Sequence, residues 1–159
     1  MNKISLAISF AVIVIIAACS GSSDEKKTTS TATPQAIDPM QDKGFGPITT
    51  ISLPSEIDED LAVMGDTLFV QKCTACHKIE KRHIGPALAG VTTRRRPEWI
   101  MNMILNPEEM VMKNETAKKL LMEYIAPMAN QSLTQDEARA VLEYFRSYDA
   151  QQNNLTEKE

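Results

Sequence analysis

The segment Cys73-Thr74-Ala75-Cys76-His77 holds two cysteines and a histidine in one short register. The pattern C-x-x-C-H is a signature of covalent haem c attachment, in which both thiols form thioethers with the haem vinyl groups and the histidine ligates the iron. Two intervening residues let a helical turn present both sulfurs to one edge of the porphyrin, with His77 below the metal. The motif therefore predicts one haem c, bound covalently through Cys73 and Cys76.

Two other kinds of site also use paired cysteines. A thioredoxin-like dithiol has the same C-x-x-C spacing, but it belongs in a βαβ pattern and would leave His77 without a role. A structural zinc site needs a second pair of ligands, and only Cys19 and His83 remain in the chain to supply it. Haem attachment is the favoured interpretation, with the dithiol and the zinc site as alternatives.

The composition is that of an ordinary soluble protein with one modest domain and tails, since 43% of the 159 residues are hydrophobic and 24% are charged. The formal net charge is −4 and no long basic stripe occurs, which argues against nucleic acid as a partner. Two of the three cysteines belong to the motif, so no disulfide framework is available. A small core would gain from a large apolar macrocycle bound inside it.

Residues 1–18 have the pattern of a secretory signal, with Lys3 followed by an uncharged apolar run that is short for a membrane span. The run ends in Ile16-Ala17-Ala18-Cys19-Ser20-Gly21, which resembles the lipobox of bacterial lipoproteins. That resemblance implies a lipid-bearing Cys19 as the first mature residue, anchored to a membrane and facing the periplasm or another extracytoplasmic space. An uncleaved anchor helix, or an ordinary signal peptide with an incidental cysteine, is the alternative.

The remaining chain divides into three parts by composition. Residues 19–56 are rich in Ser, Thr, Pro, Gly and charge, and they are predicted to form a flexible tether. Residues 57–150 have helical periodicity without a convincing strand, which predicts an all-α domain. Residues 151–159 are predicted to be a disordered tail. The apolar residues of the tether that we expect to pack loosely on the domain are Phe45, Ile48, Ile51 and Leu53.

Start signals predict four helices in the domain. Asp58-Glu59-Asp60 places acids at the start of the first helix, which leads into the cysteine motif. Pro97 can be the first residue of a second helix, and Asn114 caps a third. Thr134 and Glu137 have capping-box spacing for the last helix.

Several motifs, taken together over about residues 59–148, resemble those of class I cytochromes c. The resemblance implies a small all-α domain wrapped around one covalently bound haem c. The motifs appear in order, and they are Gly65-x-x-x-Phe69, the Cys73 to His77 segment, Gly85-Pro86-Ala87-Leu88, and a methionine before Leu133-Thr134-x-x-Glu137-Ala138.

The same resemblance implies two contacts within the domain. Gly65 and Phe69 are expected to meet the last helix around Tyr144 and Phe145. Pro86 is expected on the proximal side of the haem, where its carbonyl would accept the ring N–H of His77, fixing the tautomer and increasing the basicity of the ligand.

The second axial ligand of the iron determines whether the haem carries electrons or handles small molecules. His83 is the other histidine, and because it follows His77 closely we expect it on the proximal side or at the surface. The candidates are therefore methionines. Residues 57–150 contain seven of them: Met64, Met101, Met103, Met110, Met112, Met122 and Met128.

Met128 is the predicted axial ligand. It follows Pro127 in an irregular stretch before the last helix, and the Met-then-Leu-Thr pattern of the family implies this position. A thioether ligand stabilises ferrous iron and raises the reduction potential, which favours electron transfer. Met122 is the runner-up, followed by Met110 or Met112 in the loop expected after Pro107, and Met64 and Met103 are expected to fill the core.

Two groups of basic residues lie near the motifs. Arg94-Arg95-Arg96 is the densest cluster, and Arg95 with the indole N–H of Trp99 is predicted to hydrogen-bond the haem propionates. The alternative is a solvated loop with Trp99 in the core. The second group, which either steers an acidic redox partner or only solubilises the surface, is Lys72, Lys78, Lys81 and Arg82.

These features predict a membrane-tethered, monomeric monohaem cytochrome with His77 and Met128 as axial ligands. It would pass single electrons between respiratory or reductase complexes outside the cytoplasm, a role that needs no enzymatic reaction. One alternative is a haem-based sensor or carrier of a diatomic ligand, which requires an open or easily displaced sixth position. Another is a small peroxidase-like enzyme, for which no distal histidine is apparent.

Overall fold

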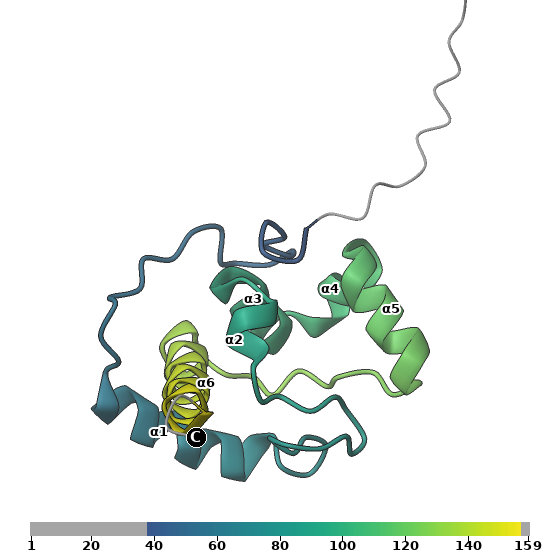
Figure 1. Cartoon of the computed structure of the whole chain (residues 1–159). Coiled ribbons are helices and arrows are strands. Elements are labelled where there is room, and N and C mark those ends of the chain that lie inside the picture. The colour runs from purple at the N-terminus through teal and green to yellow at the C-terminus, as the bar shows by residue number, and fades with distance from the viewer. Residues whose placement is uncertain (1–37, 157–159) are drawn as a thin grey trace, which may run out of the picture. The chain divides into compact units, whose positions relative to one another are not determined.

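The computed structural model describes residues 38–156, in which six helices and no strand occur (Figure 1). The predicted all-α fold is confirmed for this part of the chain. The predicted signal peptide, Cys19 and the first half of the tether lie outside the described residues. The helices are α1 (Glu59–Lys72), α2 (Val91–Arg94), α3 (Pro97–Leu105), α4 (Pro107–Lys113), α5 (Glu115–Tyr124) and α6 (Gln135–Thr156). Within 38–156, every helix is too short or too polar to cross a membrane.

Helix α1 begins where the sequence predicts it. The carboxylate of Asp58 accepts a hydrogen bond from the backbone N–H of Leu61, which satisfies one of the free donors at the helix start. Glu59 and Asp60 add negative charge to the first turn, where the helix dipole favours it. The helix ends at the C-cap Cys73, so it delivers the cysteine motif directly.

Helix α6 begins at the predicted capping box. The backbone N–H of Thr134 donates to Glu137, and the N–H of Glu137 donates to the Thr134 hydroxyl. The helix crosses α1 closely (Figure 1), and Gly65 lies at the crossing. A Cβ atom at Gly65 would overlap the carbonyl oxygen of Ala140 and lie 2.9 Å from Cβ of Tyr144. The absence of a side chain therefore permits the approach of the two helices.

An aromatic cluster packs beside this crossing. The ring of Phe69 lies 5.4 Å from that of Tyr144 and 5.7 Å from that of Phe145, in the tilted and edge-on arrangements that aromatic pairs prefer. The contacts expected between Gly65, Phe69 and the last helix are therefore present. They fix the end of α1, and with it the cysteine motif, relative to α6.

Helices α3, α4 and α5 follow one another with short connections. Pro97 and Pro107 each stand in the first turn of a helix, where a missing N–H costs nothing. The side chain of Asn114 accepts from the N–H of Ala117 and caps α5, as predicted. The loop predicted after Pro107 is wrong, because that segment is α4. Its Met110 is fully buried, while Met112 faces solvent.

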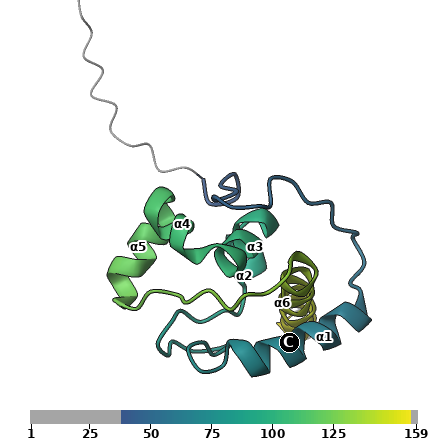
Figure 2. The same cartoon turned by 180° about the vertical axis from the view of Figure 1, so that it is seen from behind.

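The segment 38–56, which we call the N-terminal strap, is not the flexible tether that we predicted. It runs past α3 before it reaches the start of α1 (Figures 1 and 2). The buried amide of Asn102 on α3 accepts from the N–H of Ile48 and donates to the carbonyls of Ile48 and Lys43. Ile48 is buried as well. These specific bonds hold the strap on the domain, which therefore extends beyond the predicted boundary at residue 57.

Two other expectations are corrected by the structure. Helix α6 continues to Thr156, so residues 151–156 are helical where a disordered tail was predicted from their polar composition. They extend an existing helix, which costs no new nucleation. Met64, expected in the core, is 41% exposed, because the buried face of α1 is formed by Ala62, Gly65 and Phe69 instead.

Candidate haem site

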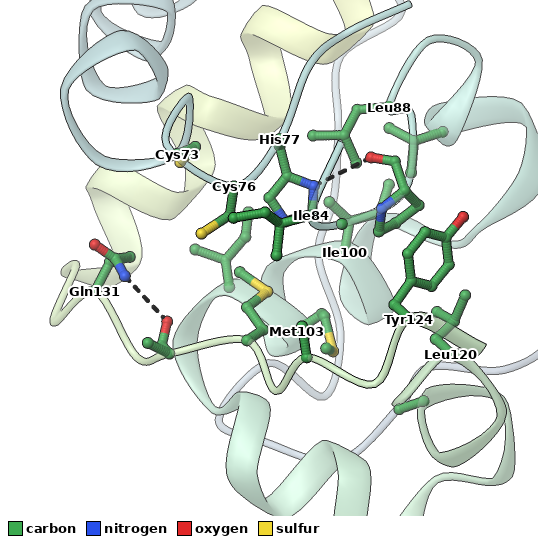
Figure 3. A pocket seen from close by; sticks show the side chains of 18 of the residues that line it. Cys73, Cys76, His77, Ile84, Leu88, Ile100, Met103, Leu120, Tyr124 and Gln131 are labelled. Carbon is green, nitrogen blue, oxygen red and sulfur yellow. Dashed lines mark hydrogen bonds between the residues drawn. The ribbon is translucent and has the colours of Figure 1, made fainter. Parts of the chain in front are cut away.

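A largely apolar cavity of about 270 Å³ lies between the end of α1 and the helices α3 and α5 (Figure 3). The residues that follow the cysteine motif, from Ile84 to Leu88, form one part of its wall. The irregular segment between α5 and α6 closes another part, with Ala126, Pro127, Met128 and Ala129. Segments that are distant in the sequence therefore meet around one space.

The cysteine motif forms a helical turn at the edge of this cavity. The N–H of Cys73 donates to Phe69, and the N–H groups of Cys76 and His77 both donate to the carbonyl of Cys73. Cys73 is half-buried and Cys76 is exposed, so the two thiols line the cavity from its edge. Burial and, to a smaller extent, Cys76 raise the pKa of Cys73 to about 11. The raised pKa keeps the Cys73 thiol protonated at neutral pH.

His77 is oriented by the backbone of the loop that follows it. Its Nδ1 lies 3.2 Å from the carbonyl oxygen of Pro86, the contact that the family resemblance implies (Figure 3). A carbonyl oxygen only accepts, so Nδ1 carries the proton and Nε2 keeps a free lone pair. Burial lowers the pKa of His77, and the bond to Pro86 opposes this only in part. The imidazole is therefore neutral, as metal ligation requires.

Gly85 leaves room for that imidazole. A Cβ atom built on Gly85 would lie 2.8 Å from Nδ1 of His77 and would overlap the ring carbon beside it. The backbone of Gly85 also donates to the carbonyl of Cys76, which keeps the loop tight against the motif. The glycine is explained by this close approach, because its φ angle lies outside the left-handed region.

The seven candidate methionines can be distinguished by whether they line the cavity. Only Met103 on α3 and Met128 line it. Met110 is fully buried elsewhere, where its sulfur lies 3.1 Å from the N–H of Phe45. Met122 is 70% exposed, His83 is exposed as well, and neither residue lines the cavity. The runner-up Met122 and the candidates Met110 and Met112 are thus not brought to the site.

The residues present fit a covalently bound haem. Two thiols and a neutral imidazole lie at the edge of an apolar space, a thioether lies within it, and Gly85 accommodates the imidazole. The zinc alternative finds no support among residues 38–156, which contain no group of three or more His, Cys, Asp or Glu side chains that could hold a metal ion. The dithiol alternative lacks its βαβ setting, since the described chain has no strand.

Comparison with known proteins agrees with this geometry. The family model described as Cytochrome c matches residues 62–149. The chain belongs to the cytochrome c family. As a member, it carries covalently attached haem c and takes part in haem-based electron transfer, and both attachment cysteines are present. No curated protein matches the chain.

Solved structures give the same assignment. A cytochrome c from Rhodothermus marinus is 44% identical, with a TM-score of 0.66, over 67% of this chain and 91% of that one. An engineered form of the R. marinus protein is also 44% identical, with a TM-score of 0.65, over 66% and 91% of the two chains. A third structure, 45% identical with a TM-score of 0.62 over the same shares, is an engineered R. marinus cytochrome c bound to a carbene intermediate.

The three arginines of the cluster Arg94-Arg95-Arg96 have different surroundings in this cytochrome c. Arg94 and Arg95 line the haem cavity, whereas Arg96 pairs with the buried Glu98. Trp99 also lines the cavity, but its indole N–H donates to Asn114 at 3.3 Å. The predicted bond of this N–H to a haem propionate stays a prediction. Arg95, whose guanidinium lies 5.2 Å from the Trp99 ring, is the other predicted propionate donor.

The hydrogen-bond network behind Trp99 could not be predicted from the sequence. Asn114 was predicted only as a helix cap, yet it also accepts from Trp99 and donates to Asp42 of the strap. Asp42 was assigned to a flexible segment and is buried. The acidic residue in a Pro- and Ser-rich stretch carries no local signal for burial, because its partner lies far along the chain.

Proposed function

We propose that this cytochrome c is a lipid-anchored, monomeric one-electron carrier of an extracytoplasmic space, with His77 and Met128 as the axial ligands. The observation that carries the ligand assignment is that His77 and Met128 line the same apolar cavity. Histidine and methionine ligation keeps the coordination closed and favours ferrous iron, both of which suit electron transfer. The donor and acceptor would be larger respiratory or reductase complexes.

The assignment of Met128 is tested against the other methionine of the cavity. Met128→Leu and Met103→Leu remove a thioether with little change in volume. Met128→Leu should abolish the weak long-wavelength sulfur-to-iron absorption band of the oxidised protein, and Met103→Leu should retain it. Loss of the band in Met103→Leu alone would transfer the role to Met103. Survival of the band in both variants would refute methionine ligation from this cavity.

Binding of a small external molecule at the iron is the second candidate function. Ile125 and Ser132, which bracket the Met128 segment, both have φ angles of 55°, a conformation that is strained for a β-branched residue such as Ile125. Such strain would assist displacement of the ligand. A related engineered cytochrome c is bound to a carbene intermediate. Carbon monoxide titration of the reduced protein separates the two functions, because a closed His/Met site binds carbon monoxide poorly and an exchangeable one binds it readily.

We also propose that basic residues near the exposed thioether edge guide an acidic redox partner. Lys81 lies in the irregular segment that follows the cysteine motif, and both Lys81 and Cys76 are exposed. Arg82 pairs with Glu123 at 3.4 Å, and Lys72 borders the cavity itself. Long-range attraction between opposite charges raises association rates and weakens with salt.

The docking proposal is tested by ionic strength and by charge removal. Lys81→Gln should slow the second-order electron-transfer rate with an acidic partner at low salt and reduce its salt dependence. Lys113→Gln on α4, which removes an equal charge elsewhere, is the matched control. A rate independent of salt, or equal effects of both variants, would exclude guidance by this surface.

The proposed anchor at Cys19 has its own test. Cys19→Ser should move the haem-containing protein from the membrane fraction to the soluble fraction. The mass of the mature protein should decrease by the mass of the attached lipid. Retention on membranes without any attached lipid would instead support an uncleaved anchor helix.

A further inference from the structure

Asp42 of the N-terminal strap is a buried carboxylate that forms no ion pair within residues 38–156. Its exposed fraction is 9%, and no ion pair formed by residues 38–156 includes it. The other buried acids differ in this respect, since Glu98 pairs with Arg96 and Lys43, and Glu143 pairs with two arginines. A buried charge without an ion pair is costly unless other groups stabilise it, so its position calls for a physical explanation.

The carboxylate of Asp42 is held by N–H donors. The side-chain amide of Asn114 donates to both oxygens, at 2.9 and 2.8 Å, and the backbone N–H of Gly44 donates to Oδ1 at 2.9 Å. An ionised carboxylate is an acceptor only, so it fixes which end of the Asn114 amide faces it. The amide oxygen must then point the other way.

That amide oxygen meets the wall of the haem cavity. It accepts the indole N–H of Trp99 at 3.3 Å and the backbone N–H of Ala117 at 2.9 Å. Trp99 lines the cavity, and Ala117, which is fully buried, lines it from α5. A chain of hydrogen bonds therefore runs from Asp42 through Asn114 to the cavity.

The charge of Asp42 also reaches the cavity directly. Burial and the neighbouring Arg94 lower the pKa of Arg95, whereas Asp42 acts in the opposite direction and raises it. Arg95 lines the cavity beside Trp99. The negative charge of Asp42 thus acts on Arg95, one of the residues that would surround the haem propionates.

We propose that Asp42 is a positioning residue that lowers the reduction potential of the haem, as a fixed negative charge that also orients Asn114 and Trp99. A buried negative charge stabilises the ferric state, which carries one more positive charge than the ferrous state, and the low dielectric of the interior strengthens the effect. The inference rests on the proposed one-electron function of this site. It assigns to the strap a part in setting the potential in addition to covering α3.

Charge removal and charge relocation test this proposal in the haem-loaded full chain. Asp42→Asn should increase the ratio of reduced to oxidised haem at a fixed ambient potential on the order of three- to tenfold, tenfold being 59 mV for one electron. The double variant Asp42→Asn/Asn114→Asp keeps the net charge and can keep the hydrogen bonds, with the carboxylate now directly on the Trp99 N–H. Its ratio should equal that of the wild type or fall below it.

Glu98→Gln is the matched control. It removes a carboxylate that is even more buried, 1% against 9% exposed, but that bonds Arg96 and pairs with Lys43 instead of holding Asn114, so its effect on the potential should be clearly smaller than that of Asp42→Asn. An equal shift in both variants, an unchanged potential in Asp42→Asn, or a raised potential in the double variant would overturn the proposal. If Asp42→Asn does not fold, the potential of the double variant alone still provides the test.

The fluorescence of Trp99, the single tryptophan of the chain, is an independent readout. The haem quenches the fluorescence of a tryptophan that is held against it. Trp99 emission should therefore increase in Asp42→Asn, where Asn114 no longer orients the indole, and should return to the wild-type level in the double variant. Potential and emission are measured without a partner protein. Failure of electron exchange with any partner would therefore count against the proposed function and leave this inference intact, whereas an unchanged potential would refute the inference and leave the carrier function standing.

Discussion

The contact between Gly85 and the imidazole of His77 shows how a single atom can determine the geometry of the site. We expect Gly85→Ala to displace the imidazole, because the new Cβ would lie 2.8 Å from its Nδ1 and the loop is tied to Cys76. Overpacking of this kind costs about 1–3 kcal/mol. Guanidinium unfolding of the haem-loaded protein measures the loss, and an altered Soret spectrum reports the ligand. Unchanged stability and spectrum would contradict the role assigned to Gly85.

The lowered pKa of Glu143 predicts how the free energy of unfolding depends on pH. Its side chain is fully buried, and although burial raises its pKa, the N–H of Asp58 and the guanidinium groups of Arg139 and Arg146 outweigh burial and lower it. A lowered pKa in the folded state contributes stability that is fully present above the ordinary value of 4.5 and is lost as the pH falls through the folded value.

Glu143→Gln should therefore cost about 3 kcal/mol at pH 7, since it leaves two arginines without their buried counter-ion. Denaturant unfolding as a function of pH gives the comparison. The difference between the wild type and the variant should be constant above about pH 5 and should shrink below pH 4.5. A difference that is independent of pH down to pH 3 would show that Glu143 contributes only its shape.

At this scale, the sequence was informative where the chemistry is local. Cys73, Cys76 and His77 are neighbours in the chain, so their relation to one haem follows from their spacing alone. The partner of the Trp99 N–H could not be predicted, because it is set by Asn114 and Asp42, which the fold alone brings together. A short-range pattern contains no information about which of several polar groups a long-range contact will select.

The crossing of α1 and α6 depends on one position, Gly65. Gly65→Ala should separate the two helices, because its Cβ would overlap the backbone of Ala140 and approach Tyr144. The gain in helix propensity, about 1 kcal/mol, is too small to offset a backbone clash, and we expect a net loss of about 2 kcal/mol. Thermal and denaturant unfolding measure it. Val63→Ala, at a 69% exposed site on α1, is the control and should change stability by less than about 0.5 kcal/mol.

Among the elements, four of the helices with a start signal were predicted, whereas α2, which has none, and α4, which has one, were missed. Asp58, Pro97, Asn114 and the pair Thr134 and Glu137 each mark a helix that the structure contains. Helix α4 is too short to show periodicity, although Pro107 in its first turn is the same signal that identified α3. The strap carries no periodic pattern at all. Its position depends on Asn102, a residue of another element, and is therefore invisible in its own sequence.

For the whole molecule, the haem cavity occupies the place where a small domain would otherwise have its core. A haem bound in this open cavity would cover the apolar side chains of its lining, and burial of apolar surface stabilises a protein by about 25 cal/mol per Å². The bound haem should therefore be part of the folding equilibrium as well as the carrier of the electron.

We expect a Cys73→Ser/Cys76→Ser variant, expressed so that no haem is attached, to lose most of its helical circular dichroism or to unfold without cooperativity. The helices that line the cavity, α3 and α5, would lose their common packing surface, whereas α1 and α6 contact each other directly and could retain partial structure. Added free haem that binds without covalent attachment should restore part of the helicity. The helices pack against the macrocycle itself, whereas the thiols are needed only for its covalent attachment. A haem-free variant with a wild-type unfolding midpoint would show that the polypeptide fills its own core, and the fold would then not depend on the cofactor.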